Sequence, residues 1–283
     1  MVNEAQGLTR FFCIGSAKTG TTLLARVLDQ HPEIACIWES YAFHPRARAS
    51  VFNPGSEKWR THGFDESDVQ RWARVWRAQP GLLLRRIVRR LTGCTILATS
   101  PFRDTMGEAL ADFAQRCDAR VVGDKWPWYI DFLEHVRSAF PNARFIYNVR
   151  DPRGVWNSAQ RFKGRGRGNE LLDQMLSRDQ LVAPYLDQPN FLTLRYEDLV
   201  RKPEETCRRL YQFLGCSYSS QYLSYDPERD PYPERWDWVP QAGQPVDPWH
   251  AVKWREQMTP VTIEAVTRHA AWFVNKYHYS PQP

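Results

Sequence analysis

Short runs of hydrophobic residues alternate along the chain with stretches in which apolar residues recur every three or four positions. The first run is Thr9–Gly15, and Leu23, Leu24, Val27 and Leu28 follow at helical spacing. Short apolar runs predict buried strands, and the wider spacing predicts helices with one buried face. Repeated along the chain, this alternation predicts an α/β fold, in which a central, mainly parallel sheet has helices on both faces.

The middle of the chain continues the pattern. Strands are predicted over Arg120–Gly123 and Arg144–Val149, and the apolar stripe from Trp128 to Phe140 predicts a helix between them. A further helix is predicted over Asp151–Phe162, because an aspartate that can cap a helix is followed by a proline suited to the first turn.

The remaining elements are predicted from shorter signals. Strands are expected over Ile34–Trp38, Thr95–Thr99 and Phe191–Leu194, and helices over residues 105–117, Glu204–Leu214 and Pro260–Lys276. Residues 44–92 and 163–190 give weaker patterns, and the Pro- and Trp-rich stretch 226–250 is interpreted as an ordered loop. With 283 residues and no internal repeat, a single domain over residues 1–283 is expected.

Composition and charge limit the classes of partner that the protein can bind. Apolar residues make up 42% and charged residues 25%, as in globular proteins. The net charge of +6 suits nucleic acid, a membrane or an anionic ligand. The basic residues are scattered, with no basic tail and no zinc or recognition-helix pattern, so no nucleic-acid partner is expected. The pattern leaves the oligomeric state open.

Location and metal content are expected from absences in the sequence. No apolar run reaches about 18 residues and no leader-like segment opens the chain, so no membrane association is expected. None of the six cysteines forms a Cys-x-x-Cys pair, which argues against a zinc site. We expect a reducing, cytoplasmic location and no metal.

The turn between the first strand and the first helix has the composition of an anion-binding loop. Backbone N–H groups and the helix dipole both favour an anion at such a turn. Nucleoside-triphosphate loops end in Gly-Lys-Ser/Thr, whereas here the lysine precedes the second glycine. On this loop alone, an ordinary strand-to-helix turn remains the alternative. The predicted binding residues after Gly15 are Ser16, Ala17, Lys18, Thr19, Gly20, Thr21 and Thr22.

A second polar segment follows the predicted strand Arg144–Val149. Arg150 ends that strand, and Ser158 lies eight residues later, about two turns into the next helix. An arginine at the carboxyl end of a parallel strand can hold a phosphate with two hydrogen bonds. Arg150 could equally pair with a surface carboxylate, and Arg153 is expected on the surface.

Together these segments resemble the sulfotransferases that use 3'-phosphoadenosine 5'-phosphosulfate (PAPS). GSAKTGTT is similar to the family's 5'-phosphosulfate loop, and RFIYNVRDPRGVWNS is similar to its 3'-phosphate motif. The segment RYEDLVRKPEETCRRLYQFLG also resembles the family, and the likeness runs from residue 11 to about residue 275. It implies the P-loop-like sulfotransferase fold, PAPS as the donor and 3'-phosphoadenosine 5'-phosphate (PAP) as the product.

The resemblance also implies further contacts to the donor. Tyr196 would lie near the adenine or the 3'-phosphate, and Lys253 and Trp254 lie in a segment similar to the one that closes over the cofactor. Within the family the chain looks closest to the tyrosylprotein, Golgi-type and bacterial branches. It lacks the catalytic histidine of the cytosolic phenol and steroid branch. Phe162 stands where the tyrosylprotein branch has an arginine, which puts that contact in doubt.

Three residues are candidates for catalysis. Lys18 lies in the loop, where an ammonium would stabilise the leaving phosphate oxygen. The resemblance makes Lys125 a second contact to the transferred group and makes Glu39 the base that takes the acceptor proton. His44 and His62 are alternative bases. Because lysines, an arginine and loop amides already neutralise the donor, no metal is required.

Two other functions remain open at this stage. A P-loop kinase or nucleotidase would need magnesium and a triphosphate, and a nucleotide- or glycan-binding protein would not need Glu39 or Lys125. The acceptor is also open among sugars, natural-product alcohols, peptides and tyrosine. The loop 163–168 could guide an acidic acceptor or could simply be solvated.

Overall fold

A five-stranded sheet forms the centre of the computed structural model, which describes residues 7–39, 57–60, 62–78, 99–164, 166–224, 226 and 246–280. Its spatial order is β2-β3-β1-β4-β5. All four neighbouring pairs of strands run parallel. The strands are β1 (Thr9–Gly15), β2 (Ile34–Trp38), β3 (Val121–Lys125), β4 (Arg144–Val149) and β5 (Phe191–Arg195). The predicted fold class, a parallel α/β sheet, is confirmed.

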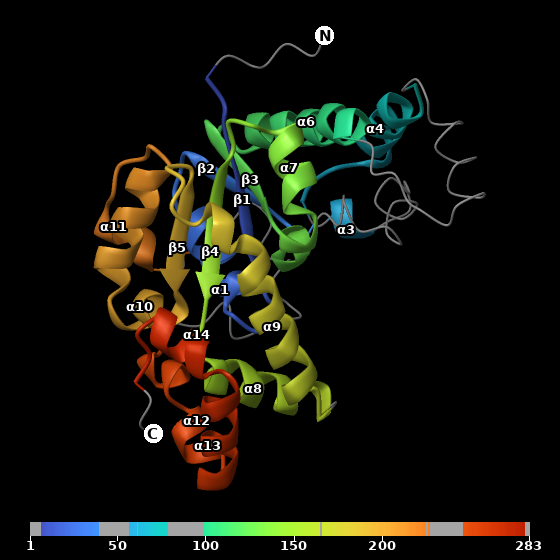
Figure 1. The fold of residues 1–283 in the computed structure, drawn as a ribbon. Coiled ribbons are helices and arrows are strands. Elements are labelled where there is room, and N and C mark those ends of the chain that lie inside the picture. The colour runs from blue at the N-terminus through green and yellow to red at the C-terminus, as the bar shows by residue number, and fades with distance from the viewer. Residues whose placement is uncertain are drawn as a thin grey trace, which may run out of the picture.

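Helices connect the strands and cover the sheet (Figure 1). Before β4 these are α1 (Thr21–Asp29), α3 (Glu57–Arg60), α4 (Glu66–Ala78), α6 (Thr99–Arg116), η1 (Pro127–Phe132) and α7 (Leu133–Ala139). After β4 they are α8 (Pro152–Arg161), η2 (Phe162–Gly164), α9 (Gly168–Val182), η3 (Ala183–Tyr185), α10 (Tyr196–Arg201), α11 (Pro203–Phe213), η4 (Ser220–Leu223), η8 (Pro248–Ala251), α12 (Trp254–Gln257), α13 (Pro260–His269) and α14 (Ala271–Lys276). None of the described helices is both long and apolar enough to cross a membrane.

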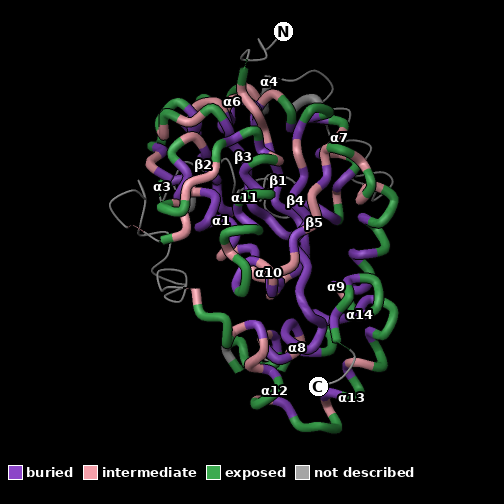
Figure 2. The backbone as a smooth tube through the Cα atoms, turned by 90° about the vertical axis from the view of Figure 1, so that its left-hand side faces the viewer, coloured by how far each residue is buried: buried purple, intermediate pink, exposed green. Residues whose placement is uncertain are grey.

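Each face of the sheet has its own hydrophobic core. On β1, Phe11 and Cys13 join the cluster that includes residues of α1 and α11. Phe12 and Ile14 join the cluster on the other face, with residues of α6, α7 and α9. Because both faces are covered, the strands are apolar almost throughout rather than alternating. Figure 2 shows the result as buried strands inside a partly exposed layer of helices.

The C-terminal helices lie at the carboxyl edge of the sheet, beside α8 (Figure 1). A buried carboxylate holds them there. Asp179 on α9 accepts hydrogen bonds from Tyr147 on β4, from Lys276 on α14 and from Tyr277. Burial raises the pKa of the Tyr147 hydroxyl well above its usual value, so this hydroxyl stays a donor. The network fixes the last turns of the chain over the ends of the strands.

The structure departs from several of the predicted elements, and the helix predicted from Trp128 to Phe140 begins as the 3-10 helix η1 before α7. The predicted helix Pro260–Lys276 is interrupted at Ala270. The prediction of a strand over Thr95–Thr99 is wrong at Thr99, which begins α6, while residues 95–98 lie outside the described residues. The helix α9 was not predicted, although its buried Leu171, Leu172, Met175 and Leu176 have helical spacing.

Candidate active site

The predicted polar residues lie along one edge of the sheet because all five strands end there. Glu39 follows β2, Lys125 ends β3, and the loop follows β1. Arg150 follows β4 and Tyr196 follows β5. The spatial order of the strands therefore places these groups in a row, with Glu39 and Lys125 at one end, the loop in the middle, and Arg150 and Tyr196 at the other end. Ligands of parallel α/β folds bind at this edge.

The loop turns its carbonyl groups toward side chains of the protein. The Ser16 carbonyl accepts from the Thr19 hydroxyl at 2.8 Å, and the Thr19 carbonyl accepts from the Asn148 side chain. The Lys18 carbonyl accepts from an Arg150 guanidinium nitrogen at 3.0 Å. With these carbonyls bound, an anion would meet the loop's amide hydrogens. The first turn of α1 holds no acidic residue and has no side-chain cap, so its N–H groups suit a ligand anion.

Gly20 lets Tyr196 approach the loop. The Gly20 backbone has φ of 91°, and a Cβ built there would lie 2.2 Å from the Tyr196 ring. No residue with a side chain fits. The Arg150 guanidinium lies 4.2 Å from the centroid of the same ring, over its face. Tyr196 therefore links the loop to Arg150, and the second nitrogen of Arg150 donates to the His250 carbonyl at 2.9 Å.

Three cations lie close together around α8. They are Arg150, Arg161 and Lys253, and within the described part of the chain none of them forms an ion pair with an acidic side chain. Burial lowers the pKa of Lys253 below its usual value, and the nearby charges of Arg150 and Arg161 lower it further. Like charges held together in this way are the arrangement expected for a phosphate site.

Arg161 is a candidate that the sequence analysis missed. The position compared with the tyrosylprotein branch was Phe162, one residue later. The guanidinium of Arg161 donates to the Asn157 side chain at 3.1 Å and to the Gln257 carbonyl at 2.9 Å. These contacts point it toward α12, beside Lys253. The signal in the sequence was an arginine three residues after Ser158, which is the same helix face.

Two further residues predicted to contact the donor, Ser158 and Trp254, have less evident roles in the structure. Ser158 lies two turns along α8, is partly buried, and makes no hydrogen bond to another described side chain. Trp254 is buried in the core, with the Arg153 guanidinium 4.1 Å from one of its ring centroids. Its indole therefore packs against α8 through Arg153. Its direct contact with the donor stays a prediction.

The prediction that Arg153 lies on the surface is wrong. Its side chain is buried and paired with Asp151 at 2.7 Å. It also donates to the Ser280 carbonyl at 2.7 Å, which ties α8 to the end of the chain. Asp151 caps α8 by accepting from the Arg153 amide, as the sequence predicts. Arg153 is surrounded because the C-terminal helices, which the local sequence does not reveal, fold over it.

At the other end of the row, Lys125 and Glu39 form an ion pair. The distance from Lys125 Nζ to Glu39 Oε1 is 2.8 Å, and the Lys125 side chain is fully buried, whereas that of Glu39 is 20% exposed. Glu39 has a left-handed backbone, with φ of 57°, and its amide donates to the Lys125 carbonyl at 2.8 Å. The turn after β2 thus directs the carboxylate back toward the lysine.

Of the two alternative bases, His62 has another role. Its Nε2 accepts a hydrogen bond from the Trp38 amide at 2.9 Å, and the ring is buried. The nitrogen that would take a proton therefore supports the end of β2 directly before Glu39. His44 lies outside the described residues.

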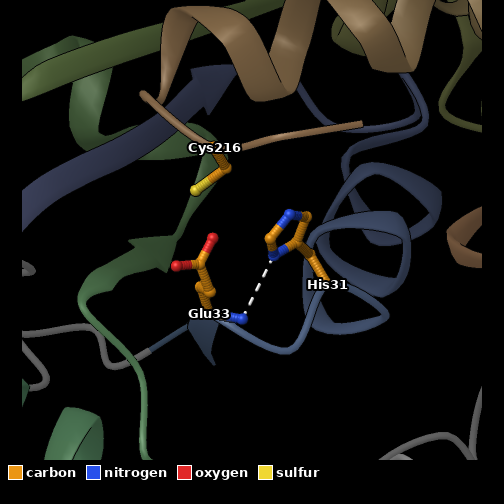
Figure 3. Close-up of side chains that lie close together, drawn as sticks. All are labelled: His31, Glu33 and Cys216. Carbon is orange, nitrogen blue, oxygen red and sulfur yellow. Dashed lines mark hydrogen bonds between the residues drawn. The ribbon is translucent and has the colours of Figure 1, made fainter. Parts of the chain in front are cut away.

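One group of metal-ligand type occurs within the described residues, at the opposite edge of the sheet. It consists of His31, Glu33 and Cys216, whose ligand atoms lie within 4.8 Å of one another (Figure 3). The His31 Nδ1 accepts from the Glu33 amide at 3.1 Å, and Nε2 donates to the Ser217 carbonyl at 2.8 Å. Both ring nitrogens are therefore used within the protein.

The rest of this group is equally unsuited to a metal. Glu33 pairs with Arg120, and burial raises the pKa of the Cys216 thiol to about 11. A metal ligand must be deprotonated. A cavity of about 640 Å³, lined in part by Gln30, His31 and Arg116, lies beside the group, far from the row of polar residues at the carboxyl edge. The group is interpreted as a structural contact, and the absence of a metal from the reaction stays a prediction.

The fold and the carboxyl edge define a class: an α/β protein with an anion-binding loop after its first strand. Comparison with known proteins places the chain within that class. Residues 10–221 match the Sulfotransferase family, and the chain belongs to it. It is therefore a transferase of the sulfotransferase type.

The chain is also similar in sequence to individual sulfotransferases. Protein-tyrosine sulfotransferase A of Caenorhabditis elegans is 27% identical over 225 residues, which cover 76% of this chain and 52% of the relative. The chain thus spans about half the length of that relative. The omega-hydroxy-beta-dihydromenaquinone-9 sulfotransferase of Mycobacterium bovis is 34% identical over 102 residues, covering 30% of this chain and 26% of the relative.

Solved structures show the same fold. The sulfotransferase domain of the Synechococcus olefin synthase superposes with a TM-score of 0.64 at 20% identity, covering 98% of this chain and 97% of that domain. At this identity the likeness concerns the fold. It confirms the predicted P-loop-like sulfotransferase architecture.

Proposed function

We propose that this protein transfers a sulfuryl group from PAPS to the hydroxyl of an acceptor. The observation that carries the proposal is the row of groups at the carboxyl edge. One end holds three cations, the middle holds an amide-lined loop with Lys18, and the other end holds an ion-paired carboxylate. A donor with phosphates at two separate positions and a transferable group fits this order.

The cation end suits the 3'-phosphate of the donor. Arg150 offers a planar guanidinium that is already oriented by the Lys18 and His250 carbonyls. Its Nε is buried without a hydrogen-bond partner, and an unsatisfied buried donor costs about 1–3 kcal/mol. A phosphate oxygen there would satisfy the donor and neutralise the repulsion among Arg150, Arg161 and Lys253.

The loop suits the 5'-phosphosulfate. The Ser16 hydroxyl is buried without a hydrogen-bond partner and faces the same turn. Together with the first amides of α1, it would hold the phosphate from which the sulfuryl group leaves. The Lys18 ammonium would stabilise the charge that develops on the bridging oxygen as the S–O bond breaks.

The ion-paired carboxylate suits proton removal from the acceptor. As the acceptor oxygen forms its bond to sulfur, its proton would pass to the Glu39 carboxylate, and the electron pair of the broken S–O bond would stay on PAP. Lys125 holds the Glu39 carboxylate through the ion pair and would contact the transferred group. Trp38 holds the lysine from the other side, with its ring centroid 4.7 Å from Nζ.

The alternative of a P-loop kinase has no observation in its favour. The loop lacks the Gly-Lys-Ser/Thr ending, and the cations near α8 supply a second phosphate site that a triphosphate would not need. The acceptor class is a further part of the proposal. Relatives are named for tyrosine and for a menaquinone hydroxyl, so both phenolic and alcoholic hydroxyls belong in an acceptor screen.

The test is a transfer assay with ³⁵S-labelled PAPS and a panel of tyrosine peptides, phenols, sugars and lipid alcohols. We expect transfer to at least one class. Glu39→Gln should bind PAP like the wild type but lower kcat by about 10²–10⁴-fold, the usual contribution of a general base. Full activity of Glu39→Gln would place the base elsewhere. Transfer from ATP rather than PAPS would overturn the proposal itself.

A further inference from the structure

The catalytic lysine of the loop is covered by an aromatic ring. Phe162 begins η2 directly after α8, and its ring centroid lies 3.0 Å from Lys18 Nζ. The ring is 44% exposed, so it lies at the mouth of the site rather than in the core. A cation this close to the face of a ring is attracted by the ring's quadrupole. The two residues are 144 positions apart in the sequence, so only the fold brings them together.

The backbone of Lys18 is already fixed, but its side chain is long. Lys18 has φ of 70°, a left-handed conformation, and its carbonyl is held by Arg150. A lysine side chain still carries about 2 kcal/mol of rotamer entropy. An ammonium that must meet a developing charge works best when that freedom has been removed beforehand. The ring face restricts Nζ on one side.

The neighbouring residue explains why an aromatic side chain can stand at this position. The resemblance to the tyrosylprotein branch implies an arginine where this chain has Phe162. Here Arg161 supplies a guanidinium at α12, where it donates to the Gln257 carbonyl at 2.9 Å and lowers the pKa of Lys253. The charge needed near α8 therefore comes from one residue earlier, and position 162 is available for a different task.

We propose that Phe162 is a positioning residue for Lys18: its ring holds the ammonium against one wall of the site, so that the lysine is oriented before the donor arrives. The proposal rests on the proposed sulfuryl transfer. It assigns to Phe162 an effect on the rate of transfer and not on the affinity for the donor PAPS, because the charge on the bridging oxygen that Lys18 serves develops only as the S–O bond breaks.

The test compares three variants in the transfer assay and in PAPS titrations without acceptor. Phe162→Leu keeps an apolar side chain but removes the ring, and we expect kcat to fall about fivefold, while the Kd for PAPS stays within about twofold of the wild type. Phe162→Tyr keeps the ring face and should restore the wild-type kcat. Phe162→Ala should lower kcat at least as much as Phe162→Leu.

Two kinetic results would overturn the proposal. If Phe162→Leu has the wild-type kcat, the ring does not orient the lysine. If its only defect is a higher KM for the acceptor, Phe162 is instead a wall of the acceptor pocket.

A spectroscopic readout separates this inference from the proposed function. In protein labelled with ¹³C-lysine, the ring current should shift the ε-methylene protons of Lys18 upfield, and the shift should disappear in Phe162→Leu. Lys18→Arg assigns the signal. An unshifted Lys18 signal overturns the inference even if sulfuryl transfer is observed. A shifted signal in a protein that transfers nothing from PAPS leaves the contact in place and refutes the function.

Discussion

The polar residues at the two edges of the sheet differ in how far they are paired within the protein. At the amino edge, His31 uses both ring nitrogens within the protein and Glu33 pairs with Arg120. At the carboxyl edge, Arg150, Arg161 and Lys253 lie close together, and none of them forms an ion pair with a described acidic side chain. Polar groups that are hydrogen-bonded within the protein stabilise the fold, whereas charged groups without ion pairs are typical of a site where a ligand supplies the opposite charge. A cluster of metal-ligand type residues whose polar atoms are already bonded is therefore weaker grounds for a site than a group of cations without ion pairs.

Of the two cations beside Arg150, Arg161 should have the larger effect on this contrast when it is replaced by alanine. Its removal takes a charged donor from the cation group, and hydrogen bonds to charged groups contribute about 1.5–3 kcal/mol. We expect the Kd for PAP to rise about tenfold or more. The exposed Arg268, which pairs with Glu264 on α13, offers the matched control, and Arg268→Ala should leave the Kd unchanged. Isothermal titration calorimetry distinguishes the two, and equal affinities would remove Arg161 from the site.

A smaller effect should follow from Lys253→Met, and it should depend on pH. The pKa of Lys253 lies below its usual 10.5 in the donor-free protein, and a bound phosphate would raise it by favouring the ammonium. At a pH where part of the donor-free protein has a neutral Lys253, binding of PAP therefore requires that the lysine take up a proton. PAP affinity should fall as pH rises toward 10.5.

Lys253→Met should bind PAP more weakly than the wild type at neutral pH. Its affinity should then fall less as the pH rises. The variant's donor-free form should also melt at a higher temperature than the wild type. The charged form of Lys253 is disfavoured by folding, and methionine removes that charge. A Kd with the same pH dependence in both proteins would show that Lys253 does not face the phosphate.

The sequence predicted the row of site residues better than their surroundings. The loop, Arg150, Lys125 and Glu39 follow strands whose apolar runs are unambiguous, and parallel topology brings such strand ends to one edge. Arg153 was placed on the surface because its burial depends on helices more than 100 residues later. Arg161 was missed because a one-residue shift along a helix changes which family position a residue matches.

The ring of Phe162 over Lys18 and the hydrogen bonds of His62 were equally beyond the sequence. Both depend on tertiary contacts between elements that are distant along the chain. The single domain, the acceptor and the location remain predictions.

The smallest effect should come from the amino edge. His31→Gln should lower the free energy of unfolding by about 1–3 kcal/mol, because two hydrogen bonds of a buried ring are lost, and it should leave PAP affinity unchanged. Burial lowers the pKa of His31 below 6.5. The unfolded chain therefore takes up a proton first as pH falls through 6.5, and this residue's contribution to stability declines below that pH.

Thermal melts at pH 5 and pH 8 check this effect, since the drop in melting temperature between them should be smaller in His31→Gln. Zinc titration of the wild type serves as the control. A large rise in melting temperature with zinc would make the amino edge a metal site and reverse the contrast between the edges.

The central claim is that the carboxyl edge holds a second phosphate. It is tested most directly by measuring the Kd of PAP and of adenosine 5'-monophosphate, which lacks only the 3'-phosphate, for the wild type and for Arg150→Ala. We expect PAP to bind the wild type at least about 100-fold more tightly than the monophosphate, since several charge-assisted hydrogen bonds are at stake. Most of that difference should vanish in Arg150→Ala. Equal affinities for the two nucleotides in the wild type would contradict the account.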